Sequence, residues 1–193
     1  MDAAQDFLQS LRTETDSLHR QLEDTSISRQ LMSPAISRKD YCLYLSLMRN
    51  VIAWQEATVF PLVKNILETD SRQKLPGIDR DLSQLSAAPH SIPFTFPQEM
   101  RDTPSALGAM YVLEGSTLGG RVILKHLAQT LQLDETNGAA FFYGYGPETG
   151  KQWSSYLKVL TGYAVTEHCE ERIISSAKNT FEAIHTYFNY IQE

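Results

Sequence analysis

Apolar residues recur at spacings of three and four along almost the whole sequence, which is the period of an amphipathic α-helix. The pattern is clearest over residues 3–24, where Leu11, Leu18 and Leu22 fall on one helical face with His19 beside them. Sustained alternation of apolar and polar residues is absent, as are Asn-Gly or Asp-Gly turns between β-branched segments. The sequence therefore predicts an all-α fold in which His19 faces inward.

A second helix is expected to begin at Ser37, because Ser37 and Asp40 have the spacing of a capping box. Its periodic pattern runs towards Leu67. Pro61 lies inside this stretch, and a proline ring without an N–H bends or interrupts a helix. We therefore expect a change of direction at Pro61.

The second half of the chain is also expected to be helical. Thr103-Pro104 supplies an N-cap and a first-turn proline for a helix that runs into a cluster of glycines. Two final helices are expected over residues 150–164 and 168–192. The two halves are connected by a short predicted helix, residues 78–85, and by an ordered loop that contains Pro89, Pro93 and Pro97.

The chain has 193 residues, so residues 1–193 are predicted to form a single domain. Its 17 Lys and Arg face 23 Asp and Glu, and this net charge of -6 disfavours nucleic-acid binding by phosphate neutralisation. No run of about 18 apolar residues is present, and the first residues are acidic where a signal peptide is basic. We expect a cytoplasmic protein that binds neither nucleic acid nor membranes.

Three glycines within six residues, Gly115, Gly119 and Gly120, interrupt a helical pattern. Each costs about 1 kcal/mol relative to alanine inside a helix, so a specific reason for them is expected. One explanation is a bent helix whose bare backbone lets something flat and bulky approach. The other is a tight helix crossing or an ordinary turn between two helices.

His19 has neighbours suited to a ligand site. Glu23 lies four residues on, where its carboxylate can accept the Nδ1 proton and leave Nε2 free for a metal. Arg12 lies two turns earlier, where it can pair with an anionic group of a ligand. A satisfied core histidine between two solvated surface charges is the alternative. The remaining histidines form no ligand cluster with carboxylates.

One inward histidine opposite a helix opened by glycines is what a planar cofactor held between two helices requires, and heme fits best. Phosphate-binding glycine loops and the serine nucleophile elbow are absent. Two motifs then make the sequence similar to the heme oxygenase family, in particular its bacterial, biliverdin-producing branch. Residues 11–23 resemble the family's proximal helix, and residues 111–121, Tyr-Val-Leu-Glu-Gly-Ser-Thr-Leu-Gly-Gly-Arg, resemble its glycine-bent distal helix.

The resemblance implies a bundle of helices with heme held between the proximal and distal helices. It implies that His19 is the axial ligand and Glu23 its partner. Arg12 and Tyr111 match residues that contact a heme propionate, and Phe181 matches a residue of the heme pocket. The distal backbone would be supplied by Gly115, Ser116, Gly119 and Gly120.

The implied reaction is opening of the heme ring by O2 to give biliverdin, iron and carbon monoxide, with heme as both cofactor and substrate. The sequence has no flavin, nicotinamide or iron–sulfur signature, so a separate reductase or ferredoxin is expected to supply electrons. A bacteriophytochrome is one implied acceptor of biliverdin. Ser116 stands where animal-type members carry an aspartate, so the proton route is expected to use backbone, Ser116 and water.

Three other readings stay open at this stage. A heme carrier or sensor on the same fold would keep His19 and lack oxygen chemistry. The wider superfamily includes cysteine-dependent thiamin-degrading enzymes, which would make Cys42 or Cys169 a nucleophile, although neither has an evident base beside it. An all-α protein without heme is the third.

Overall fold

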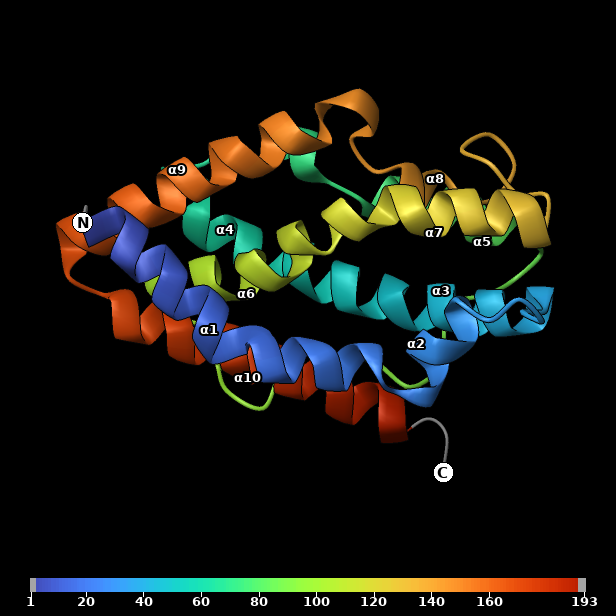
Figure 1. The fold of residues 1–193 in the computed structure, drawn as a ribbon, viewed down its shortest axis with the longest axis horizontal. Helices are drawn as coiled ribbons and strands as arrows, with labels where there is room; N and C mark the ends of the chain where they lie inside the picture. The colour runs from blue at the N-terminus through green and yellow to red at the C-terminus, as the bar shows by residue number, and fades with distance from the viewer. Residues whose placement is uncertain (1–2, 191–193) are drawn as a thin grey trace.

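The computed structural model describes residues 3–190, and every regular element in that range is helical (Figure 1). The α-helices are α1 (Ala3–Glu23), α2 (Ser26–Leu31), α3 (Arg38–Trp54), α4 (Phe60–Val63), α5 (Leu75–Gln84), α6 (Thr103–Gly115), α7 (Thr117–Thr130), α8 (Ala140–Tyr143), α9 (Thr149–Glu167) and α10 (Glu170–Tyr190). A π-helical segment, η1, spans Gln55–Val59, and 3-10 turns η2 and η3 span Asp70–Arg72 and Gly146–Glu148. The all-α prediction is confirmed.

Helix α10 packs along both α1 and α6, so the first and last helices lie side by side (Figure 1). The crossing of α6 and α10 is close at Gly108, where a Cβ atom would lie 2.7 Å from Cβ of Ser176. The periodicity of the sequence does not identify Gly108, because the constraint comes from a helix distant in sequence.

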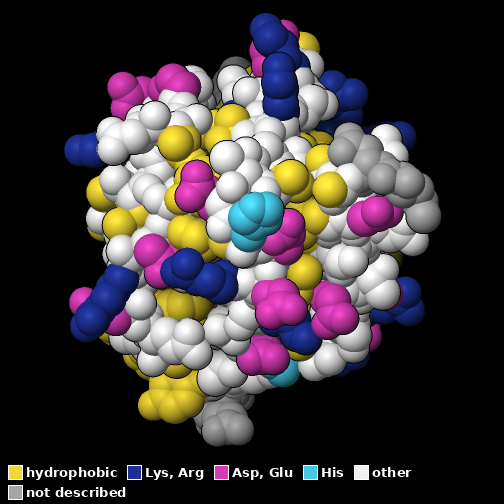
Figure 2. Space-filling view, turned by 90° about the vertical axis from the view of Figure 1, so that its left-hand side faces the viewer, with side chains coloured by type: hydrophobic (Ala, Val, Ile, Leu, Met, Phe, Trp, Pro, Cys, Tyr) yellow, Lys and Arg dark blue, Asp and Glu magenta, His cyan; other side chains and the backbone are white. Residues whose placement is uncertain are grey.

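Figure 2 shows the left-hand end of the molecule, where acidic and basic side chains are interspersed on the surface.

Of the two predicted helix starts with capping signals, one is confirmed and the other is displaced by one residue. Ser37 caps α3, with its hydroxyl accepting from Asp40 N–H and the Asp40 carboxylate accepting from the Ser37 N–H, so the capping box is confirmed. The N-cap of α6 is Asp102, not Thr103, because the Asp102 carboxylate accepts from the backbone N–H of Ser105. Pro104 does lie in the first turn.

The expected break at Pro61 takes the form of the π-helical segment η1, directly before α4. A proline ring collides with the carbonyl of the residue four positions earlier, here Ala57, and a wider turn relieves that collision. Helix α4 then ends at Val63, so the prediction that the helix runs to Leu67 was wrong.

Helix α5 begins at Leu75, three residues before the predicted start at Ile78. Its first turn is capped from a distant element, since Oε1 of Glu56 accepts the backbone N–H groups of Lys74 at 2.6 Å and Leu75 at 2.8 Å. The proline-containing loop is ordered as predicted, because the Asn50 amide donates to the carbonyls of His90 and Ile92.

The last two helices are close to their predicted ranges. His168 is not the first residue of α10. It is the C-cap residue of α9 and has a left-handed backbone conformation, with φ +48°. The predicted end of the last helix at Gln192 lies outside the described residues. No helix within residues 3–190 is long and apolar enough to cross a membrane.

Candidate active site

A cleft of about 790 Å³ opens between α1 on one side and α6, α7 and α8 on the other, with α10 at its base. Most of its lining is apolar, as in pockets that bind small organic ligands. The cleft brings together every residue that the sequence singled out as a site residue: Arg12, His19, Glu23, Tyr111, Gly115, Ser116, Gly119, Gly120 and Phe181.

His19 faces the cleft between the helices, but 55% of its side chain is exposed, so it is not buried with the leucines as the periodicity suggested. The buried stripe of α1 consists of Phe7, Leu11 and Thr15. One turn further along α1, His19 and Leu22 line the cleft, because α1 forms one of its walls there. The imidazole is therefore accessible to a ligand.

Glu23 lies beside His19, but not in the predicted arrangement. Its Oε1 is 3.7 Å from Nε2 of His19, which is beyond hydrogen-bond distance, whereas acceptance of the Nδ1 proton was predicted. A half-turn of the imidazole about its Cβ–Cγ bond exchanges Nδ1 with Cδ2 and Nε2 with Cε1, so the side chain must also rotate about Cα–Cβ to present Nδ1 to Glu23. The ring of His19 is held instead by Phe181, whose ring meets it edge to face with centroids 5.7 Å apart.

Arg12 of α1 and Tyr111 of α6 both line the cleft. Tyr111 is half-buried, and burial raises the pKa of its phenol, although a hydrogen bond with Thr15 and the charge of Arg12 act in the opposite direction. The phenol is therefore protonated near neutral pH. Together, Arg12 and Tyr111 provide a cation and an O–H group suited to an anion.

The glycine cluster bends the chain between α6 and α7 at Ser116. Two side-chain hydroxyls satisfy carbonyls in the last turn of α6: Ser116 Oγ donates to Leu113 O at 2.8 Å, and Thr117 Oγ1 donates to Glu114 O at 2.6 Å. The predicted interruption is therefore present and locally stabilised, in the form of a turn at Ser116 between two helices.

The three glycines have different surroundings. A Cβ atom at Gly120 would lie 2.6 Å from the backbone carbonyl of Phe142, so close packing against α8 requires glycine there. A Cβ at Gly115 would make ordinary contact with Trp153 at 3.6 Å. At Gly119 a Cβ would meet no atom within 4 Å, although the residue lines the cleft. Gly119 thus leaves space that the protein itself does not fill.

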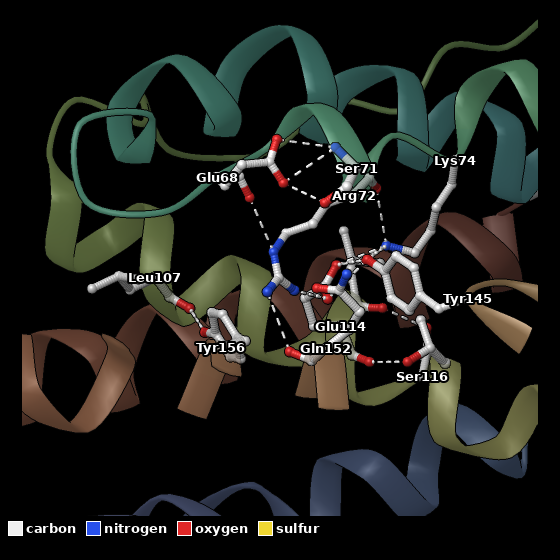
Figure 3. A network of polar contacts seen from close by, with 12 residues as sticks. Glu68, Ser71, Arg72, Lys74, Leu107, Glu114, Ser116, Tyr145, Gln152 and Tyr156 are labelled. Atoms are coloured by element: carbon white, nitrogen blue, oxygen red, sulfur yellow. Dashed lines mark hydrogen bonds and ion pairs between the residues drawn. The ribbon is translucent and has the colours of Figure 1, made fainter. Parts of the chain in front are cut away.

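A buried ionic cluster next to the bend was missed by the sequence analysis (Figure 3). The carboxylate of Glu114, fully buried at the end of α6, accepts from Arg72 at 2.6 Å and from Lys74 at 2.7 Å. The hydroxyl of Tyr145 donates to the same carboxylate at 2.8 Å. An acidic residue within the apolar run of α6 was the available signal, but its partners lie 31 to 42 residues away in sequence.

The cysteines lack the setting of nucleophiles. Burial raises the pKa of both the Cys42 and the Cys169 thiol, which disfavours the thiolate that would react. Within residues 3–190, no group of three His, Cys, Asp or Glu side chains is arranged to hold a metal ion.

The heme oxygenase family model matches residues 5–190, nearly the whole sequence. The chain belongs to the heme oxygenase family. A direct search of curated proteins gives no match.

Solved heme oxygenases share the fold. The enzyme of Neisseria meningitidis, solved with NO and CO bound, has 25% sequence identity and a TM-score of 0.72, with 95% of this chain and 92% of that chain covered. The Leptospira interrogans enzyme has 17% identity and a TM-score of 0.76, covering 95% and 98%. Heme oxygenase-1 of the cyanobacterium Synechocystis, in complex with heme, has 14% identity and a TM-score of 0.71, covering 96% and 92%.

These findings confirm the family and the fold that the two sequence motifs indicated. As a heme oxygenase, the chain is an oxidoreductase that degrades heme to biliverdin, and heme is its ligand and its substrate. The reading as a heme carrier or sensor is not favoured.

Proposed function

We propose that heme binds in the cleft between α1 and α7, with His19 as the axial ligand of its iron. The observation that carries the proposal is the accessible imidazole of His19 in an apolar cleft. Its Nε2 atom lies 3.7 Å from Oε1 of Glu23, which is too far for a hydrogen bond between them. Neutral imidazole is a common heme-iron ligand.

The residues of the cleft fit a large planar ligand with anionic groups. Gly119 leaves open space in the wall contributed by α7. Apolar side chains of α10, among them Phe181, Ile184 and Phe188, supply surface for a porphyrin ring. Arg12 supplies a positive charge in the same cleft.

Each remaining site residue has a proposed role. Arg12 pairs with a propionate and Tyr111 donates its O–H to the same group. Glu23 accepts an N–H from His19 once the imidazole turns, since 3.7 Å separates the two side chains as they stand. Phe181 holds the plane of the imidazole through the edge-to-face contact.

The bound heme supplies the iron that activates O2. The protein surrounds the substrate, orients it and limits the access of water. Between Gly115 and Gly120 the distal wall has no acidic side chain. The hydroxyl proton of Ser116 is used in its bond to Leu113 O, so Ser116 is available to water as an acceptor. Protons therefore reach the substrate through water held by Ser116 and the backbone of this segment.

Electrons come from a separate reductase or ferredoxin in this proposal, and a bacteriophytochrome is one acceptor of the biliverdin released. The proposal includes a cytoplasmic location for the protein, because soluble reductases and ferredoxins are found there. Residues 1–193 act as one domain, which is supported by the cleft drawing its walls from α1 and α10, the two ends of the chain.

The test is a hemin titration followed by optical spectra, with His19→Ala and, as a matched control, His185→Ala on α10. We expect a one-to-one complex in the parent and the control, a changed spectrum with His19→Ala, and recovery when imidazole is added. Addition of a reductant in air should then convert the parent complex to biliverdin. An unaltered spectrum with His19→Ala would overturn the assignment of the ligand.

A further inference from the structure

The Glu114 cluster, consisting of Arg72, Lys74, Glu114 and Tyr145, has no role in the proposed chemistry, although it is the most deeply buried group of charges described. The Glu114 side chain is 0% exposed, that of Arg72 is 2% and that of Lys74 is 7%. Buried charges are costly unless each is paired and hydrogen-bonded. Four residues from three separate regions of the chain therefore form a paired, buried cluster that the proposed chemistry does not use.

Each donor nitrogen of the cluster makes at least one hydrogen bond. Lys74 Nζ donates to Glu114 Oε1, to the Tyr145 hydroxyl at 2.9 Å and to the backbone carbonyl of Arg72 at 3.3 Å. Arg72 donates to Glu114, to Glu68 O at 3.1 Å and to Gln152 O at 3.2 Å. A buried network in which every donor nitrogen has a partner favours one geometry, because movement of its members leaves buried polar groups unpaired.

The geometry of the cluster constrains the bend between α6 and α7 at Ser116. Glu114 is the residue immediately before Gly115, so its side chain anchors the last turn of α6. Figure 3 shows Arg72 and Lys74 reaching Glu114 from one side and Tyr145 approaching beside them. Through Arg72 the same contacts include α9, at Gln152. The side chain at the end of α6 is thus fastened by Arg72 of η2, by Lys74 directly before α5 and by Tyr145 directly before η3. Thr117 at the beginning of α7 contacts Glu114 through the backbone carbonyl.

Two members also connect the cluster to the cleft. Lys74 lines the cleft itself. Tyr145 directly follows Gly144, and the preceding segment places Phe141, Phe142 and Gly144 in the cleft wall. Burial and the Glu114 carboxylate raise the pKa of Tyr145, so its hydroxyl remains a proton donor in this position.

We propose that the Glu114 cluster is a positioning device that sets the angle between α6 and α7, and with it the height of the distal backbone, Gly115 to Gly119, over bound heme. Its members do not touch the substrate's reacting atoms in this scheme. The inference rests on the proposed binding of heme in the cleft. It is distinct from that proposal, because it also makes a claim about the protein before heme binds.

The first experiment uses the protein without added heme. Tyr145→Phe removes one hydroxyl from the cluster and keeps the ring, while Tyr143→Phe, at an exposed tyrosine two residues earlier, is the matched control. Amide hydrogen exchange is measured for residues 113–120. We expect exchange there to be faster by about threefold or more in Tyr145→Phe, with α3 unaffected and Tyr143→Phe like the parent. Unchanged exchange in this segment would overturn the inference.

The second experiment uses the hemin complex. In Tyr145→Phe we expect the hemin affinity to remain within about twofold of the parent, since His19 is untouched and Tyr145 does not line the cleft. We expect the acid–alkaline transition of the ferric optical spectrum to shift by about 0.5 pH unit or more, because the distal surroundings have moved. Lower thermal stability with an unshifted transition would mean that the cluster is only structural and would overturn the inference.

The two proposals fail differently. If the parent protein does not bind hemin, the proposed function fails, while faster local exchange in Tyr145→Phe would still establish that the cluster controls the bend. If hemin binds through His19 and both the exchange and the spectra of the variants match the parent, the proposed function stands and the positioning role is refuted.

Discussion

The ring of Phe181 on α10 stands nearly perpendicular to the imidazole of His19 on α1, with ring planes 83° apart and centroids 5.7 Å apart. Phe181 is 5% exposed and fixed by the core, whereas His19 is more than half exposed. A buried ring thus orients an accessible one. The orientation of the His19 ring in the cleft therefore depends on Phe181, a residue about 160 positions later in the sequence.

Replacement of Phe181 should therefore affect both stability and ligand binding. Phe181→Leu is expected to weaken hemin binding about three- to tenfold, because an edge-to-face aromatic pair contributes ~0.5–1.5 kcal/mol. Phe94→Leu is the control, since Phe94 is similarly buried but packs on Trp54 and Tyr187 away from the cleft. Hemin titration and thermal unfolding are measured for both. Equal losses of affinity would contradict the orienting role.

The distal glycines should respond in opposite ways to an added methyl group. Gly119→Ala is expected to leave the heme-free protein as stable or stabilise it by up to ~1 kcal/mol, because its Cβ would contact nothing. It should weaken hemin binding about tenfold or more by filling the cleft wall. Gly120→Ala should destabilise the heme-free protein by ~1–3 kcal/mol, since Phe142 O is 2.6 Å from the new atom. Denaturant unfolding and hemin titration separate the two effects, and a stability loss in Gly119→Ala would refute this explanation.

Arg12→Gln should weaken hemin binding by about two- to fivefold and reduce its dependence on salt, as expected for an exposed ion pair. Arg20→Gln is the matched control, because Arg20 is also exposed on α1 but pairs with Asp16. Titrations are repeated with the dimethyl ester of hemin, in which both propionate charges are absent. A difference between Arg12→Gln and the parent that persists with the ester would argue against propionate pairing.

Asp102 should give α6 a pH-dependent cap. Partial burial opposes its ionisation, but hydrogen bonds from Ser105 and the charge of Arg172 outweigh that effect and lower the pKa of the carboxyl. A lowered pKa in the folded state stabilises the fold above the unfolded-state pKa of about 4, and this contribution disappears as the pH falls through the folded-state value.

Asp102→Ala is accordingly expected to lower the free energy of unfolding by about 1 kcal/mol at pH 7, with a smaller difference from the parent below about pH 4. Asp102→Asn keeps an oxygen acceptor and should retain most of the cap, while losing the pH dependence. Urea unfolding across pH 3–7 measures these differences. A constant difference between Asp102→Ala and the parent at every pH would refute the ionised cap.

The features that could be predicted from the sequence depend on residues close together along the chain. Helical periodicity, the Ser37–Asp40 capping box and the interruption at Pro61 involve contacts within a few positions, and each is present in the structure. The two motifs around His19 and Gly115 likewise indicated the family, and the family model confirms it.

The features that could not be predicted depend on which distant segments meet. The sequence by itself indicated the long helices, the family and nine of the residues that line the cleft. Tertiary structure alone decided that His19 is exposed, that Gly120 packs against Phe142, and that Glu114 binds Arg72 and Lys74. Hydrogen bonds within a helix form between neighbours in sequence, whereas burial and charge pairing arise only when separate elements pack together.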